Sequence, residues 1–390
     1  MIAPNISDSL SLHLTSPEVA VDEHVRRRNI ELGEWAMARD RIYLDKCFWI
    51  YLRNARTKKT NESAAYDLLD GLVQSVKRGH RVCPISDTLF LELLKQSDLQ
   101  TRAATAELID ELSCGVTLVP HPTRVATEIA HFFHVNSARE VYPLESLVWS
   151  KLTNVLGVQH PSASAYPPEE RLAIQKAFFD YTWDISLLKM LEIIGDSGPP
   201  ESSYSELAAR LNQENAAHVH RMDKFSQVYE DEIFGCLELV APIACDVLHD
   251  MAEKIAGRSI TVSTEGREAA INEAYAFLRA AIARQPVKRA LRTLHLEALF
   301  HAAMRWNRTQ KIVANDLYDF HHAEAALGYC DVFLTDGPMH TLLNQGHLAI
   351  RRDFSCHIIS SLGEAASWSQ GRLPLPSLHP RAQAHPPKRA

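Results

Sequence analysis

The stretch YCDVFLTDG (329–337) decides the fold of this chain, because a short apolar run in it ends in an aspartate followed by a glycine. We predict a buried strand over residues 331–335 that ends at Asp336. The segment just before it, NDLYDFHHAEAA (315–326), predicts a helix that carries Asp319 in its first turns. A carboxylate near a helix start and another just past a strand end are placed to converge on one spot.

Two more acids have similar settings. Asp45 ends the apolar run IYLD, and Glu92 interrupts the run FLELL. Asp45 and Asp336 end predicted strands, where open parallel sheets place ligand sites, and Glu92 and Asp319 lie in flanking helices. Four carboxylates brought close together would repel and desolvate one another, and a bound divalent cation removes that cost. Because oxygen ligands suit Mg²⁺ or Mn²⁺ rather than zinc, the sequence predicts an acidic magnesium or manganese site.

Each of these acids also has a structural interpretation. Asp45 could cap the helix that follows it, and Asp336 could be a turn residue before Gly337. Glu92 could face solvent from a helix edge, and Asp319 could be an exposed helix residue. For any single residue the structural role is the commoner one. The joint placement of all four favours a site.

Strands and helices alternate before residue 136 and after residue 308, which is typical of a parallel sheet covered by helices. The expected strands are 41–45, 81–86, 115–120, 331–335 and 356–360. The expected helices are 17–39, 59–77, 99–112, 123–135, 316–327 and 338–345, with one more that contains Glu92. Ser16 with Pro17 predicts the start of the first helix, and Ser86 or Asp87 predicts the start of the helix containing Glu92.

Residues 136–308 have almost no strand signal. Helical patterns follow one another there over 169–195, 202–257, 265–284 and 286–306; the pattern over 202–257 predicts two or three helices, with Pro242 as a break. We therefore expect an α/β fold, a parallel sheet flanked by helices, with a large all-α insertion lobe. The expected organisation is an N-terminal helical extension at 1–40, a β/α core at 41–135 and 309–362, the lobe at 136–308 and a disordered tail at 363–390.

At four segments the chain resembles the PIN-domain nuclease superfamily. The matching residues are IYLD ending at Asp45, PIS ending at Ser86 with Glu92 six residues on, Asp319 followed by Ala323, and FLTD ending at Asp336. The segment 115–120 and the helix after it also look like the family's middle strand and helix. The resemblance covers roughly residues 41–135 and 309–362. Cys47 stands where the family often has a small polar residue, and the compact members lack so large an insertion.

The resemblance implies a PIN-like fold and a metal-dependent endonuclease that hydrolyses phosphodiester bonds. The implied substrate is single-stranded or structured RNA, in preference to DNA. In proteins that look like this, acids at these positions bind divalent metal, so Asp45, Glu92, Asp319 and Asp336 are the expected catalytic and metal-binding residues. A bound Mg²⁺ or Mn²⁺ would polarise the scissile phosphate and lower the pKa of a bound water.

Five further residues are candidate accessory members of the site. Asp316 lies one turn before Asp319 and could add a ligand, and His322 shares that helical face and could orient a phosphate or a water. For His322 we favour a partly buried histidine hydrogen-bonded to a neighbouring carboxylate. For Asp331, which begins its strand, we favour a structural or capping role. The other two are Thr335 and Ser86.

Basic side chains elsewhere must hold a nucleic acid. The candidates are Arg26 to Arg28, Lys58 with Lys59, and Arg351 with Arg352. Each set is more often a solvated face than a binding groove. The sequence therefore leaves the substrate-binding residues unassigned.

Three other interpretations compete with a nuclease. The first is an inactive PIN-like binding or scaffold protein that acts through its helical lobe. The second, a phosphohydrolase with an aspartyl nucleophile, lacks the required pair of aspartates two residues apart after a strand. The third is a zinc site, but no pair of histidines in the sequence offers a complete set of ligands. Residues 218 and 220 do not share a helix face, and neither do residues 321 and 322. His131 and His134 share a face but have no clear third ligand.

Composition narrows the class of protein. A formal net charge of −7 argues against a surface that binds nucleic acid throughout, while leaving room for a local basic groove. The seven cysteines are odd in number and form no Cys-x-x-Cys pair, which disfavours a disulfide framework. We expect a cytoplasmic protein with no signal peptide and no membrane partner. A lobe of this size on a nuclease would suit a toxin or defence role, with a homo-oligomer or an inhibitor bound through it.

Overall fold

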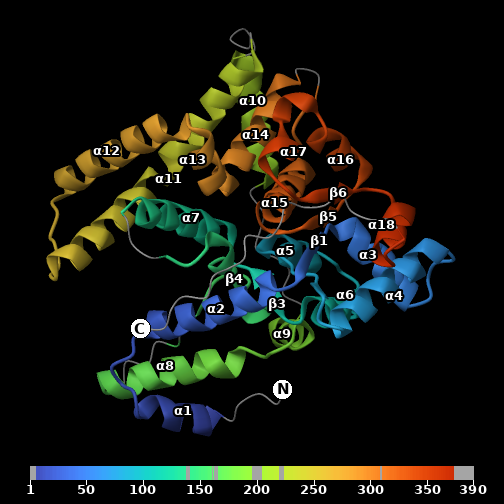
Figure 1. Ribbon diagram of the computed structural model, residues 1–390, viewed down its shortest axis with the longest axis horizontal. Coiled ribbons are helices and arrows are strands. Elements are labelled where there is room, and N and C mark those ends of the chain that lie inside the picture. Colours follow the sequence, from blue (N-terminus) through green and yellow to red (C-terminus); the bar gives the residue numbers. More distant parts are fainter. Residues whose placement is uncertain are drawn as a thin grey trace.

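A parallel sheet of four strands, in the order β2-β1-β5-β6, is the centre of the fold (Figure 1). The computed structural model describes residues 6–137, 141–159, 161, 166–195, 204–218, 224–307 and 310–372. The four strands are β1 (Asp40–Leu44), β2 (Arg81–Val82), β5 (Val332–Leu334) and β6 (His357–Ile359). Two more strands, β3 (Val116–Leu118) and β4 (Trp149–Lys151), pair antiparallel, and a parallel bridge between Ile85 and Thr117 joins β3 to the β2 side of the sheet.

The strand residues alternate between two cores. Ile42 and Leu44 of β1 belong to a core cluster shared with helices on one face of the sheet. Tyr43 and Phe333 point the other way, into a second core shared with other helices. The first set includes α3 (Lys46–Arg56), α4 (Ser63–Lys77), α5 (Asp87–Leu94), α6 (Leu99–Ser113) and α18 (Leu362–Ser369), and the second includes α7 (His121–Asn136), α14 (Arg292–Trp306) and α15 (Ala314–Tyr329). The expected α/β class, with a parallel sheet flanked by helices, is confirmed.

The helices of residues 136–308 pack in two places. One group lies beside α7 in Figure 1, where α11 packs along α12, α14 and α7. In the other place α8 packs against the N-terminal helices, and α9 packs against α6. The helices concerned are α1 (Ile6–Leu14), α2 (Val21–Met37), α8 (Pro168–Thr182), α9 (Leu187–Ile194), α10 (Tyr204–His218), α11 (Phe225–Ala256), α12 (Thr264–Ile282) and α13 (Gln285–Ala290).

The N-terminal prediction was wrong in detail. The first expected helix does not begin at Ser16 and Pro17 but at Val21, with Ala20 as its N-cap, and α1 precedes it. The ammonium of Lys176 on α8 donates to the Ser16 carbonyl (2.9 Å). The chain around Ser16 is thus a turn that lets α1 and α2 both pack on α8.

Three predicted helix boundaries in the middle were also wrong. Pro242 lies inside α11 and does not break it, although an internal proline removes one helical hydrogen bond. The pattern over 169–195 divides because the Asp110 carboxylate accepts from the backbone N–H of Leu187 (2.7 Å) and starts α9 there. The helix expected over 286–306 divides at Leu291, whose φ of −101° and ψ of 54° leave the helical region.

Strand and tail predictions need three corrections. Strand β4 lies in the segment where almost no strand signal is present, because its pairing partner β3 is distant in sequence. The strand expected over 81–86 ends at Val82, since Pro84 cannot donate to the ladder. Residues 362–369 form α18 rather than a disordered tail, with Trp368 buried against the core. Residues 373–390 lie outside the described part of the chain. Within the described ranges, no helix combines the length and apolar character needed to span a membrane.

Candidate functional site

Asp45 and Asp336 lie just beyond the carboxyl ends of β1 and β5, at the topological switch point of the sheet. From β1 the chain crosses to β2 on one side, and from the adjacent β5 it crosses to β6 on the other. Open α/β sheets bind ligands outside the carboxyl ends of the strands at such a point. Leu44 pairs with Leu334, so Asp45 and Thr335 follow side by side, and Asp336 is one residue further.

Asp45 is buried and held from two directions. One carboxylate oxygen accepts from the backbone N–H of Lys46 (2.5 Å), which makes Asp45 the N-cap of α3. The other accepts from the Thr335 hydroxyl (3.1 Å). Burial raises the pKa of Asp45 above its ordinary value, against the opposing effect of the His322 charge. The predicted capping role is therefore real, but a carboxylate has capacity for further contacts.

Asp336 has a comparable local role. It is the N-cap of α16 (Gly337–Leu343), and its Oδ1 accepts from the backbone N–H of Met339 (2.8 Å). Both strand-end aspartates thus lie at helix N-termini, where negative charge is favoured. Their capping bonds fix where their carboxylates lie.

Asp319 reaches the same place from α15. Its Oδ2 accepts from the side-chain amide of Asn315 (3.0 Å). Burial, together with the negative charges of Asp45, Asp336 and Glu92, raises the pKa of Asp319 to about 7. A carboxyl with this pKa lies among other carboxylates in a partly desolvated setting.

Cys47 lies among the same carboxylates. Burial first, and then the charges of Asp45, Asp336 and Asp319, raise the pKa of its thiol well above the ordinary value. The thiol therefore stays protonated and is no nucleophile or thiolate ligand. We refer to Asp45, Glu92, Asp319 and Asp336 together as the acidic site.

Glu92 of α5 is neutralised within the protein. Its Oε1 accepts from the Lys46 ammonium (3.1 Å), and its Oε2 lies 2.8 Å from His322 Nε2. Burial alone would raise the pKa of Glu92, but His322 and Lys46 outweigh it and lower the pKa. Glu92 does not face open solvent, since only 4% of it is exposed.

His322 links Glu92 to a buried hydroxyl pair. Its Nδ1 lies 2.7 Å from the Tyr43 hydroxyl, which lies 2.6 Å from the Ser86 hydroxyl. Burial lowers the pKa of His322, but the bond to Glu92 and the nearby carboxylates raise it further than burial lowers it. An imidazolium donates from both nitrogens, here to Tyr43 and to Glu92. This is the histidine–carboxylate bond expected for His322, with full rather than partial burial.

Of the remaining accessory candidates, two lie beside the acidic site and two have structural contacts instead. Ser86 and Thr335 are buried beside the site. Asp316 instead accepts from the Val313 backbone N–H (2.8 Å) and closes the start of α15. Asp331 lies at the other end of β5, where its carboxylate accepts from the Arg41 guanidinium (3.0 Å). This ion pair is a contact of the structural kind that we expect for Asp331.

The acidic site is wider than a closed metal cage. Within the described ranges, two histidine-containing groups bring three potential ligand atoms within 4.8 Å of one another, and the acidic site is not one of them. Mg²⁺ usually keeps several waters and takes only one or two carboxylates directly. Three direct carboxylate ligands are therefore not in place here, and an ion would be held mainly through waters.

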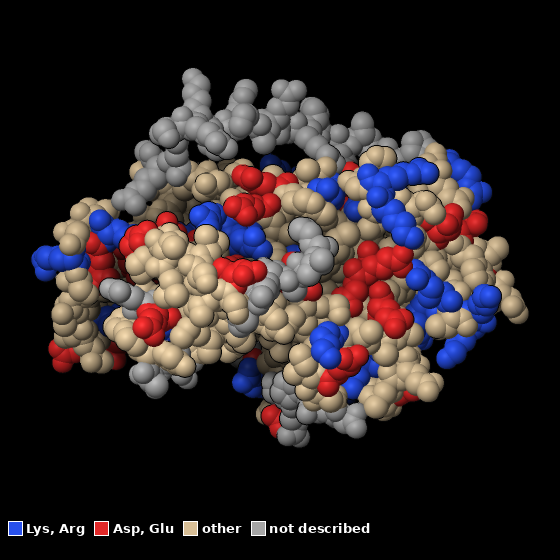
Figure 2. Space-filling view, turned by 90° about the horizontal axis from the view of Figure 1, so that it is seen from below, with Lys and Arg blue, Asp and Glu red and all other residues tan. Residues whose placement is uncertain are grey.

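The predicted basic residues do not gather around these acids. Lys58 and Lys59 follow the far end of the 11-residue helix α3, about 16 Å from Asp45. The Arg28 guanidinium stacks on Trp183, 4.6 Å from the ring centre. Arg351 and Arg352 belong to α17 (Ile350–Asp353), which precedes β6 and so lies toward the opposite edge of the sheet. Figure 2 shows basic and acidic side chains interspersed over one face.

Sequence reasoning missed two members of the site. Tyr43 lies two residues before Asp45 and so points to the same side of the strand, a signal that was available. Lys46 follows Asp45 directly, but its partner Glu92 is 46 residues away in sequence. Only the fold brings that ion pair together.

No protein-family model, curated protein or solved structure matches this chain. We therefore infer its function from the residues of the site.

Proposed function

We propose that the chain is a metal-dependent endonuclease of the PIN-like kind, which hydrolyses phosphodiester bonds in RNA in preference to DNA. The observation that carries the proposal is the placement of Asp45 and Asp336 at the switch point of the sheet. Glu92 and Asp319 reach the same edge from α5 and α15. The four segments that carry the resemblance to PIN-domain nucleases are thus the segments that supply the acidic site.

The donor set fits a hard divalent cation. All four members are carboxylates, and burial, followed by the negative charges of the neighbouring acids, raises the pKa of Asp319, an effect that a bound cation would oppose. Asp45, Asp319 and Asp336 would hold Mg²⁺ or Mn²⁺, which when bound polarises the phosphate and acidifies a water. Glu92 is already engaged by Lys46 and His322 and would complete the site through water.

The protein's own side chains have distinct tasks in this proposal. Thr335 orients the Asp45 carboxylate by its hydroxyl (3.1 Å). His322 fixes Glu92 from the buried side. The Lys46 side chain is 39% exposed and lies beside the acids, so its ammonium is placed to contact a substrate phosphate.

An inactive scaffold protein is the second candidate. The observation in its favour is the internal neutralisation of Glu92 by Lys46 and His322, which lowers the need for a metal ion. In that case the helical lobe would be the working surface. The raised pKa of Asp319 disfavours it, because a scaffold has no use for a crowded carboxyl.

Cleavage of labelled single-stranded RNA and DNA in Mn²⁺, Mg²⁺ or EDTA tests the proposal. We expect metal-dependent cutting by the wild type and a loss of about 100-fold or more in Asp336→Asn, because removal of a carboxylate weakens metal binding. The matched control is Asp250→Asn, at an exposed residue on α11, which should cut like the wild type. Wild-type activity in Asp336→Asn would refute the site, and no cutting together with no Mn²⁺ binding would favour the scaffold.

A further inference from the structure

Two adjacent histidines on α15 point to different sites. Successive helix residues are rotated by about 100°, so His322 faces the acidic site while His321 faces away from it. His321 Nδ1 lies 3.0 Å from an oxygen of Glu324, which is three residues on and on the same helix face. That oxygen also lies 3.3 Å from Nε2 of His121, the first residue of α7.

A fourth potential ligand comes from α14. Glu297 places a carboxylate oxygen 3.8 Å from His121 Nε2. In a tetrahedral zinc site with bonds of about 2.0–2.2 Å, ligand atoms are about 3.3 Å apart. The distances from the Glu324 oxygen to the two histidine nitrogens, 3.0 and 3.3 Å, lie near that value, and ligand atoms of these three residues all lie within 4.8 Å of one another. Of these described residues, Glu297 is close to His121 alone, so its side chain would have to move toward the other two residues to complete a tetrahedral site.

The carboxylate at the centre is buried and incompletely bonded. The Glu324 side chain is 1% exposed, and its Oε1 has no hydrogen-bond partner among the described residues. The same holds for His121 Nε2, which approaches two carboxylates without a hydrogen bond of normal geometry. A buried carboxylate oxygen without a hydrogen-bond partner is costly, and a bound ion would satisfy it.

Neighbouring residues hold the two imidazoles in place. The backbone N–H of His121 donates to the Asp87 carboxylate (3.0 Å), which fixes the first residue of α7. The ring of Tyr204 packs on that of His321, with centroids 5.8 Å apart. The side chains of His121 and Glu297 are 20% and 23% exposed, which leaves an entry path for an ion.

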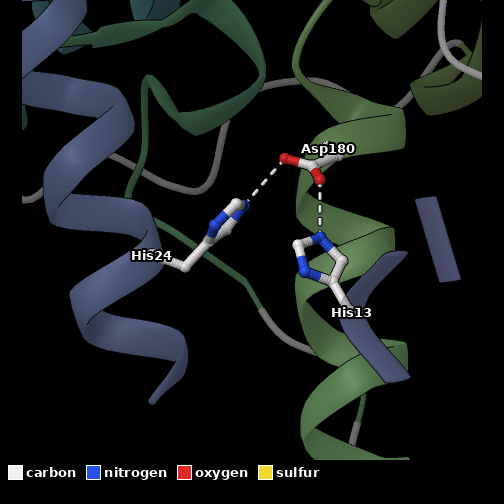
Figure 3. Close-up of side chains that lie close together, drawn as sticks. All are labelled: His13, His24 and Asp180. Carbon is white, nitrogen blue, oxygen red and sulfur yellow. Dashed lines mark hydrogen bonds and ion pairs between the residues drawn. The ribbon is translucent and has the colours of Figure 1, made fainter. Parts of the chain in front are cut away.

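A second histidine group in the protein is different. Figure 3 shows His13 and His24 both pointing at Asp180. Their Nε2 atoms lie 2.7 and 2.8 Å from its two oxygens, and Ser9 donates to one of these at 2.9 Å. Both carboxylate oxygens are therefore satisfied. This group is a hydrogen-bond network that ties α1 and α2 to α8.

We propose that His121, His321 and Glu324, with Glu297 as the fourth ligand, form a zinc site separate from the acidic site. Two imidazoles with carboxylates suit Zn²⁺, whereas the all-carboxylate acidic site suits Mg²⁺ or Mn²⁺. The ion would join α7 to the consecutive helices α14 and α15, which lie more than 150 residues further along the chain. Zinc would thus fix the helix that also carries Asp319.

Metal content of the untagged full chain tests the proposal. After dialysis against excess Mg²⁺ without chelator, we expect about one zinc per chain by elemental analysis, and a higher Tm than for the chelator-stripped protein. Both His321→Gln and Glu324→Gln should lower zinc affinity by about 100-fold or more, measured by competition with a chromophoric chelator. The matched controls His24→Gln and Asp336→Asn should bind zinc like the wild type.

Several outcomes would overturn the zinc site. They are the absence of zinc binding by the stripped wild type, or equal loss of zinc in His24→Gln. If His321→Gln and Glu324→Gln do not fold, Glu297→Gln removes the partly exposed ligand and must still weaken zinc binding. Because zinc content is measured without cleavage, this result is independent of the proposed nuclease activity.

Discussion

Replacement of Asp319 by asparagine should make the metal-free protein more stable. The pKa of Asp319 is raised from 3.8 to about 7 by burial and by neighbouring carboxylates. A folded-state pKa above the unfolded value means that folding stability falls as pH rises from about 4 to 7 and stays lower above pH 7. A shift of about 3 units corresponds to about 4 kcal/mol at pH 8. Discounted for partial exposure, we expect about 2–4 kcal/mol.

Urea unfolding in EDTA measures this effect. At pH 8 Asp319→Asn should exceed the wild type in free energy of unfolding by about 2–4 kcal/mol, and at pH 5 by roughly a third of that. Added Mn²⁺ should raise the stability of the wild type by ligand linkage and that of the variant much less. The control Asp250→Asn should follow the wild type in both conditions. A variant that is less stable than the wild type at pH 8, or that shows no change of pH dependence, would refute the crowding of carboxylates.

Three further predictions concern other residues. Thr335→Val removes the hydroxyl that donates to Asp45, so stability should fall by about 1 kcal/mol and Mn²⁺ affinity by about tenfold, by urea unfolding and calorimetric titration. Burial lowers the pKa of His295 to about 4, so folding stability is highest above pH 6.5 and falls as the pH falls toward 4. In urea unfolding at pH 7 and 4.5, His295→Gln should therefore show a decline in stability about 2 kcal/mol smaller than that of the wild type. Arg41→Met leaves Asp331 unpaired and should cost about 1–3 kcal/mol while Mn²⁺ affinity stays unchanged, because the pair lies at the other end of β5. Unchanged stability in Arg41→Met, an unaltered pH profile in His295→Gln, or wild-type Mn²⁺ affinity in Thr335→Val would contradict the respective reasoning.

The sequence predicted the parts of the site that depend on local pattern. A short apolar run that ends in aspartate implies a buried strand with a carboxylate at its end, and both Asp45 and Asp336 lie there. The order of strands could not be read in this way. That β5 pairs with β1 across nearly 290 residues is a property of the whole chain, and it is what makes the two aspartates neighbours.

Errors arose where distant contacts outweighed local signals. Pro242 stays within α11 because that helix packs along α12, α14 and α7. The short strand β4 exists only through its pairing with β3. The same holds for the histidine group around Glu324, because His121 comes from α7 and Glu297 from α14, and no local pattern around His321 indicates either of them.

The charges around the acidic site balance one divalent cation. Its four carboxylates carry four negative charges when all are ionised. Lys46 and the protonated His322 supply two positive charges through their contacts with Glu92. Two negative charges then remain, and without a cation the raised pKa of Asp319 removes one of them by protonation. One Mg²⁺ or Mn²⁺ would displace that proton and leave the site neutral, whereas a second ion would need the added negative charge of a substrate phosphate. Lys46 has a special place in this charge balance. If its ammonium moved from Glu92 to a substrate phosphate, the negative charge of Glu92 would no longer be neutralised, and the net negative charge of the acidic site would rise as the substrate binds.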